Sequence, residues 1–228
     1  MTNIFILAAQ RSAIGSYGGS LKDTPPIDLA IPVAKDAIAK SGVPADAIQH
    51  AIYGHVIHTE PRDMYSPRCI SIGAGLAETA PAFQVNRLCG SGLQAIVSAT
   101  QLIQLGDCDT ALAGGVEVMS RGAYILPAQR WGARMGDAAV VDMMTGALHD
   151  PFGIGHMGIT AENIAADYQI SREDMDAFAA QSQSRAAHAD AAGYFTGLID
   201  ISLGNLLGTG RSLLAHWQKR DQKTQDLK

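Results

Sequence analysis

Four short apolar runs alternate with helical patterns in the first half of the chain, and this alternation constrains the fold more than any other feature. Each run reads as a buried strand, whereas each helical pattern carries its apolar residues along one side. Strands that are joined through helices by short links are typical of a mostly parallel sheet covered by helices. The sequence therefore predicts an α/β domain. Its predicted strands are 4–9, 50–56, 82–85 and 110–114. Its first predicted helix follows Pro25-Pro26 and is ended by Ser41-Gly42, and the next two are 66–76 and 90–105.

The pattern changes after residue 119. The next stretch begins with long irregular pieces, and two helices are predicted behind them at 160–168 and 171–192, with Ser171 placed as the N-cap of the second. The last residues change again, because 211–228 carry a net charge of +3 in an otherwise acidic chain. We therefore divide the chain into an α/β domain at 1–119, a helical domain at 120–203 and a divergent tail at 204–228.

Composition excludes several classes of function. The net charge of −5 and the pI of about 5.7 give no electrostatic case for nucleic acid or an anionic membrane as a partner. No apolar run approaches the length that spans a bilayer, and the N-terminal run lacks the basic region of a signal peptide. Three cysteines without a CxxC spacing indicate reduced thiols rather than a disulfide framework or a zinc site. We therefore expect a cytoplasmic protein that binds no metal.

Cys89 is the residue with the clearest chemical potential. It lies in the stretch NRLCGSGLQAI, directly after a predicted strand and directly before a predicted helix. A helix N-terminus stabilises a thiolate, and Gly90 and Gly92 leave room for a ligand to approach the sulfur. The other interpretation is a small buried hydrophobic residue at a strand–helix turn. The local pattern leaves both interpretations open.

Longer stretches of the sequence resemble the thiolases, the acyl-CoA C-acetyltransferases. The resemblance covers roughly residues 3–200, and its motifs together are highly specific. The pieces most similar to broad-range bacterial β-ketothiolases are EPRDMY and RWGARMGDAAVVDMMTGALHDPF. The stretches that resemble the family are RSAIGSYGGSLKD, YGHVIHTEPRDMYSPR, NRLCGSGLQAIVSATQLIQLGDCDTALAGGVEVMSRGAYILP and HMGITAENIAADYQISREDMDAFAAQSQSRA.

The resemblance implies a fold, a reaction and a set of site residues. The fold would be a three-layer α/β/α N-terminal thiolase domain followed by a helical, CoA-binding loop domain. Cys89 would become acylated by acetyl-CoA and then take part in a Claisen condensation to, or thiolysis of, a 3-ketoacyl-CoA. His156 and Met157 would line the pantetheine tunnel, although a loop histidine and a core methionine are the alternative reading. CoA thioesters would be the substrates, no cofactor would be bound, and the protein would form a homo-oligomer, either a dimer or a tetramer.

The sequence also departs from the family pattern. The family's second sheet domain carries NEAFA, GHP and CxGGG motifs, and none of the three occurs here. We therefore expect the second thiolase domain to be absent, as in a truncated or frame-shifted product. Two functions follow from this: an acetyltransferase whose activity alone is doubtful, or a non-catalytic fragment that binds CoA or a full-length subunit.

Several other polar residues are candidates for lesser roles. Glu117 follows a predicted strand and is expected to be a buried hydrogen-bonding carboxylate. Arg121, Arg130 and Arg134 are expected either to meet CoA phosphates or to lie at the surface or a subunit contact. Cys69 and Cys108 are expected to be structural.

Overall fold

The structure, a computed structural model, describes residues 3–195 in two compact units. The first unit ends at Gly122 and the second begins at Ala123, three residues after the predicted boundary. The predicted tail at 204–228 lies outside the described residues. Within the described part of the chain, no helix is both long enough and apolar enough to cross a membrane.

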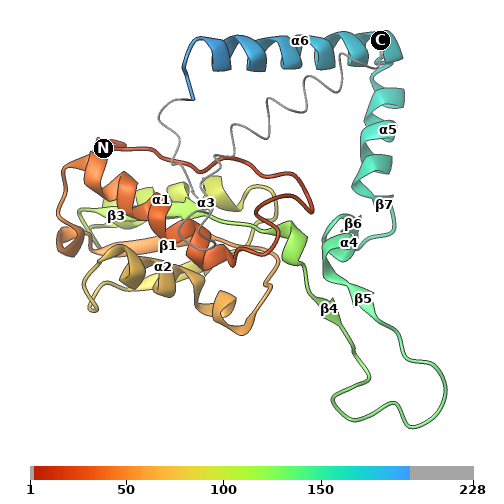
Figure 1. The fold of residues 1–228 in the computed structure, drawn as a ribbon, viewed down its shortest axis with the longest axis horizontal. Helices are drawn as coiled ribbons and strands as arrows, with labels where there is room; N and C mark the ends of the chain where they lie inside the picture. Colours follow the sequence, from red (N-terminus) through yellow and green to blue (C-terminus); the bar gives the residue numbers. More distant parts are fainter. Residues whose placement is uncertain (1–2, 196–228) are drawn as a thin grey trace. The chain divides into compact units, whose positions relative to one another are not determined.

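A three-stranded parallel sheet forms the centre of the first unit (Figure 1). Its strands are β1 (His50–Gly54), β2 (Ala82–Val85) and β3 (Ala111–Gly115), in the order β2-β1-β3. In the middle strand, Ile52 lies opposite Phe83 on one side and Ala113 on the other. The prediction of a mostly parallel α/β domain is therefore confirmed, and the strand at 82–85 has the predicted bounds.

Helices cover both faces of this sheet. On one face, α1 (Pro26–Ser41) and α2 (Ser66–Ala74) bury Ile27 and Ile70 against Ala51 and Tyr53. On the other face, α3 (Ser91–Leu105) packs Ala95 and Ala99 on Ile52. Alternate residues of β1 thus serve opposite layers, as the two-residue period of a strand requires. The result is the expected α/β/α arrangement. Short 3₁₀ helices complete the unit at Ala45–Ala47, Pro61–Tyr65 and Met119–Arg121.

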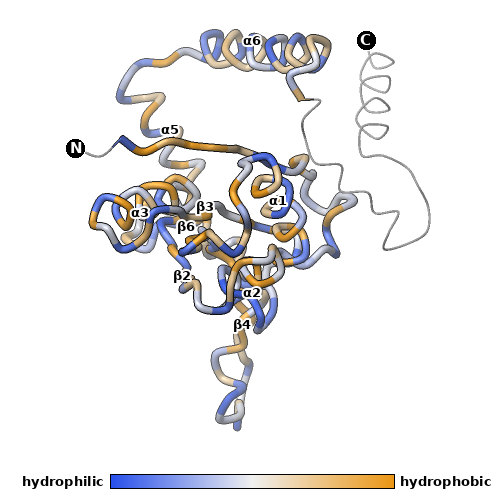
Figure 2. The backbone as a smooth tube through the Cα atoms, turned by 90° about the vertical axis from the view of Figure 1, so that its left-hand side faces the viewer, coloured by the Kyte–Doolittle hydropathy of each residue, from blue (hydrophilic) through white to orange (hydrophobic). Residues whose placement is uncertain are grey.

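The predicted buried strand at 4–9 is wrong. This segment forms no strand, and the side chains of Phe5 and Ile6 are 75% and 76% exposed. The orange stretch near the N-terminus in Figure 2 shows how apolar the segment is. A strand forms only where its backbone groups pair with those of a neighbouring strand. A groove of about 820 Å³ is lined by residues of this segment and of β3. Apolar character alone therefore did not produce sheet pairing.

The second unit contains short hairpins and two longer helices. Both helices were predicted, but α5 begins three residues earlier than expected because His156 provides its N-cap. Ser171 caps α6 as predicted, since its hydroxyl accepts a hydrogen bond from the Asp174 N–H at 3.1 Å. The elements are β4 (Tyr124–Ile125), β5 (Val141–Asp142), α4 (Met143–Ala147), β6 (His149–Asp150), β7 (Gly155–His156), α5 (Met157–Asp167) and α6 (Arg172–Ala191).

A pair of isoleucines on α2 tests the packing of the first unit. Ile70 is fully buried between α1 and the sheet, whereas Ile72 on the same helix is 40% exposed. We expect Ile70→Ala to lower the free energy of unfolding by about 2–5 kcal/mol, because it removes buried methyl groups and leaves a cavity. Urea unfolding followed by circular dichroism measures the effect. Ile72→Ala is the matched control, and an equal loss in both variants would contradict the described core.

Candidate functional site

Cys89 lies in a tight turn between β2 and α3. The strand ends at Val85, and the helix begins at Ser91 with Gly90 as its N-cap. The thiol is free, and the residue is exposed. The interpretation of Cys89 as a small buried hydrophobic residue therefore does not describe this structure, and its thiol is open to a reagent or substrate.

Backbone hydrogen bonds give this turn its shape. The N–H of Gly90 donates to the carbonyl of Arg87 at 3.1 Å, and the N–H of Ser91 donates to that of Leu88 at 3.0 Å. Leu88 adopts a φ of 49°, in the left-handed region that non-glycine residues rarely enter. Cys89 follows directly, so its position depends on this uncommon conformation.

The first turn of α3, which follows Cys89 in the chain, offers polar backbone groups. Within residues 3–195, the backbone N–H groups of Gly92 and Leu93 have no hydrogen-bond acceptor. A Cβ atom added at Gly92 would meet no atom within 4 Å, so there is open space beside this residue. Free N–H groups at a helix N-terminus attract negative charge, such as a thiolate or the oxygen of a tetrahedral intermediate.

His156 and Met157 lie together at the start of α5, in the second unit. The Nδ1 atom of His156 accepts the N–H of Gly158 at 3.0 Å, which places the hydrogen of the neutral ring on Nε2. Its ring lies edge-on to that of His149, with centroids 5.2 Å apart. Met157 is 42% exposed and is not a core residue. The two residues are neighbours, but Cys89 belongs to the other unit, so their roles beside it stay predictions.

A polar cluster joins the ends of β1 and β3. Glu117 accepts the N–H groups of Val56 and Ile57, each at 3.0 Å, so it is a hydrogen-bonding carboxylate as expected, but it is not buried, because its side chain is 30% exposed. Its Oε1 lies 3.5 Å from Nε2 of His55, a residue with no exposed surface. The carboxylate thus holds the chain that leaves β1 against the chain that leaves β3.

His55 also connects this cluster to β2. Its Nδ1 lies 3.2 Å from the hydroxyl of Ser66, which donates to Oε1 of Gln84 at 2.8 Å. The amide nitrogen of Gln84 donates to the backbone carbonyl of His55 at 3.1 Å. Sequence patterns did not single out these three residues, because HAIYGHV reads as a continuous strand. A histidine and a glutamine in otherwise apolar strands were the available signal.

Burial sets the ionisation of the cluster. Loss of hydration lowers the pKa of His55 below its ordinary value, although the nearby Asp63 carboxylate opposes this shift. Loss of hydration also raises the pKa of Glu117, while the N–H groups that it accepts oppose that rise. His55 is therefore neutral near pH 7, and its contact with Glu117 is not a full ion pair.

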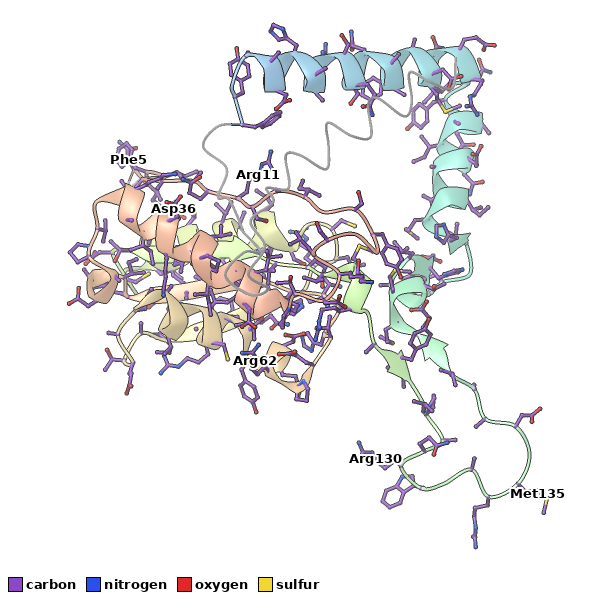
Figure 3. The ribbon with its side chains drawn as sticks, viewed as in Figure 1. Phe5, Arg11, Asp36, Arg62, Arg130 and Met135 are labelled. Carbon is purple, nitrogen blue, oxygen red and sulfur yellow. The ribbon has the colours of Figure 1, made fainter. Side chains whose placement is uncertain are left out.

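The three candidate arginines separate into two groups. Arg121 donates to the Glu60 carboxylate and to the Asp23 carbonyl, each at 3.1 Å, so internal partners hold its guanidinium. Arg130 and Arg134 are exposed on the loop that connects β4 to β5, where Figure 3 labels Arg130. Their exposure agrees with each of the expected roles, so these roles stay predictions.

The other two cysteines have surroundings unlike those of Cys89. Cys108 is buried and Cys69 is half-buried, and both thiols are free. Burial raises the pKa of the Cys108 thiol, which keeps it protonated and unreactive. In the part of the chain that the structure describes, no group of three or more metal-binding side chains comes together.

Replacing His55 by glutamine tests the polar cluster through pH. Because the pKa of folded His55 is below 6.5, the unfolded chain binds more protons as the pH falls below that value, and folding stability is lost. We expect His55→Gln to lose less stability than the parent chain between about pH 7.5 and about pH 5.5. Urea unfolding at the two pH values measures this. His188→Gln, at an exposed histidine, is the control. Equal pH dependence in parent and His55→Gln would contradict the assignment.

Solved structures with this fold include two thiolase-type enzymes. The crystal structure of the Bacillus anthracis acetyl-CoA acetyltransferase matches with a TM-score of 0.82 and 38% identity, over 86% of this chain and 50% of that one. Human mitochondrial 3-ketoacyl-CoA thiolase in complex with CoA matches with a TM-score of 0.84 and 36% identity, over 87% and 51%. Both structures are thus similar to this chain in backbone fold and in sequence.

Sequence comparison gives the same family. The beta-ketothiolase BktB of Cupriavidus necator is 55% identical over 192 residues, which make up 84% of this chain and 49% of that protein. An acetyl-CoA acetyltransferase of Chromobacterium violaceum is 47% identical, over 84% and 49%. The chain thus spans about half the length of the curated relatives it matches. The family model for the thiolase N-terminal domain matches residues 4–205, and the chain therefore belongs to the thiolase family.

Proposed function

We propose that the chain is the nucleophile-bearing half of an acyl-CoA C-acetyltransferase, in which Cys89 accepts the acetyl group of acetyl-CoA. The observation that carries this proposal is the exposed thiol in the turn before α3, in a chain 55% identical to a beta-ketothiolase. The thiol is accessible to a thioester, and the free N–H groups of Gly92 and Leu93 lie in the helical turn that follows.

The proposed reaction has two covalent steps. The Cys89 thiolate attacks the thioester carbonyl of acetyl-CoA, and CoA leaves as a thiolate that takes up a proton. A second acetyl-CoA then loses a methyl proton to a base. The resulting carbanion attacks the carbonyl of the acetyl group that is bound to Cys89. A 3-ketoacyl-CoA leaves, and the Cys89 thiolate is regenerated; thiolysis is the reverse. Such a scheme predicts ping-pong kinetics and uses CoA thioesters as substrates, without a bound cofactor.

His156 and Met157 are proposed to contact the pantetheine arm of CoA. The outward Nε2–H of His156 is a hydrogen-bond donor suited to a carbonyl, and the thioether of Met157 adapts to an irregular apolar chain. A related thiolase that was crystallised in complex with CoA supports this ligand class. We also propose that the protein acts as a homo-oligomer, either a dimer or a tetramer, as the family resemblance implies.

Proton transfer is the step for which this sequence lacks the family's residues. None of its seven histidines lies in a GHP motif, and no cysteine follows Cys108 to form a CxGGG motif. Loss of a general base commonly lowers a rate by about 10²–10⁴-fold. In the proposed scheme this chain alone is therefore slow, and slowest in the condensation step that removes a methyl proton.

A non-catalytic role is the second candidate. On α3, the side chains of Leu93, Ile96 and Val97 are 69%, 42% and 40% exposed, which is unusual for neighbouring apolar residues on one helix. Such a surface favours association with another polypeptide. In this alternative the chain binds CoA or a full-length thiolase subunit and transfers no acetyl group.

Acetylation of the purified 228-residue chain tests the proposal. We expect incubation with acetyl-CoA to add one acetyl group to Cys89, because acylation requires only the thiolate and the thioester. Intact-mass measurement, followed by fragmentation, locates the group. Thiolysis of acetoacetyl-CoA is expected to be about 10²–10⁴-fold slower than in the full-length Cupriavidus necator relative.

Two variants control this experiment. Cys89→Ala should abolish acetylation, whereas Cys108→Ala should leave it unchanged, since Cys108 is buried. A folded chain that binds CoA but acquires no acetyl group would overturn the acetyltransferase proposal and favour the non-catalytic alternative.

A further inference from the structure

The hydroxyl of Ser91 joins the two ends of the turn that contains Cys89. It accepts the N–H of Arg87 at 2.8 Å and donates to the carbonyl of Leu88 at 2.7 Å. Ser91 is only 4% exposed, so water does not compete well for these bonds. One buried hydroxyl therefore links the start of the turn to its end. Cys89 is the middle one of the three residues between Arg87 and Ser91.

The conformation inside this turn needs such support. A leucine in the left-handed region is strained, because its Cβ crowds the backbone. The side chain of Leu88 is 58% exposed, so packing does little to compensate for this strain. The hydrogen bonds around the turn are left to hold it. Of these, the two made by the Ser91 hydroxyl can be removed by a single side-chain substitution.

Close packing against the ends of two strands fixes the position of Ser91. A methyl group added at Gly54, the last residue of β1, would lie 2.7 Å from Cβ of Ser91 and 3.0 Å from the nitrogen of Gly92. Gly115, the last residue of β3, would place the same atom 3.5 Å from Cα of Gly92. The first turn of α3 thus rests on two glycine backbones, and little room remains for Ser91 to shift.

We propose that Ser91 is a positioning residue for Cys89, which holds Leu88 in its left-handed conformation and keeps the sulfur beside the first turn of α3. The inference rests on the proposed function only in taking Cys89 as the nucleophile. It deepens that function by naming what aims the thiol. Ser91 itself takes no part in bond making, and its effect passes through the backbone of residues 87–90.

The test measures the reactivity of the thiol rather than acetyl transfer, so its outcome is independent of the acetyltransferase proposal. Cys69→Ala and Cys108→Ala are introduced first, so that Cys89 is the only thiol in the full chain. Ser91→Ala in this background should slow alkylation of Cys89 by iodoacetamide by roughly three- to tenfold at constant pH, because the turn no longer holds the sulfur in its accessible position. Circular dichroism confirms that the variant is folded.

Ser71→Ala is the matched control. Ser71 is also fully buried near the sheet, and its hydroxyl donates to a carbonyl three residues earlier, Arg68, at 2.9 Å. It lies on α2, away from the turn, so its loss should leave the alkylation rate of Cys89 unchanged. Alkylation that is equally slow in both variants would show a general effect of instability and overturn the proposal, as would an unchanged or faster rate in Ser91→Ala.

A second pair of variants keeps the proposal testable if Ser91→Ala does not fold. Gly54→Ala leaves the hydroxyl in place but displaces Ser91 through the added methyl group. Gly73→Ala is its control, because the added methyl group would lie 2.5 Å from Cδ1 of Ile31, between α1 and α2. We expect slower alkylation of Cys89 in Gly54→Ala alone. Equal rates in these two variants would overturn the positioning role.

Discussion

The close packing of α3 on the glycine ends of β1 and β3 is the contact on which the rest of the first unit depends. Gly54 and Gly115 leave no side chain between the sheet and the first turn of the helix, so backbone meets backbone. Deeper in the layer, Ala95 packs on Ile52 and holds the helix along the sheet. The distance of α3 from the sheet then determines the position of the turn that precedes the helix. A thiol in that turn is therefore placed by the sheet itself, which is more rigid than a loop.

The polar cluster around His55 and Glu117 performs a related task on the other side of the strand ends. The backbone beyond the last residue of a parallel strand carries N–H groups that find no acceptor in the neighbouring strands. Glu117 accepts two of them, at Val56 and Ile57, and Gln84 donates to the carbonyl of His55. All three strands thereby become linked beyond their last ladder hydrogen bonds. Partial loss of hydration disfavours the charged form of each group, which explains why the pKa of His55 is lowered and that of Glu117 is raised.

Sequence patterns predicted the elements better than the contacts between them. The strand at 82–85 and the helices behind Pro25 and before Gly106 were found because apolar periodicity and helix-ending residues are local signals. Residues 4–9 have the same apolar signal, but periodicity reports a preference for burial and not the presence of a pairing partner. The cluster of His55, Ser66 and Gln84 depends on strand register, which no single stretch contains. Leu88 was missed for another reason: left-handed turns are expected at glycine or asparagine, and leucine gives no such signal.

The contacts that place Cys89 and the groups that would activate it have different origins in the chain. Every described contact around the turn comes from residues 54–115, which lie within the layered core of the first unit. Placement of the thiol is thus a local property of the first unit. The GHP and CxGGG motifs of the family do not occur in these 228 residues. In the proposed reaction the first covalent step depends mostly on placement, whereas the carbon–carbon step depends on a base. The reactivity of Cys89 therefore measures the first requirement by itself.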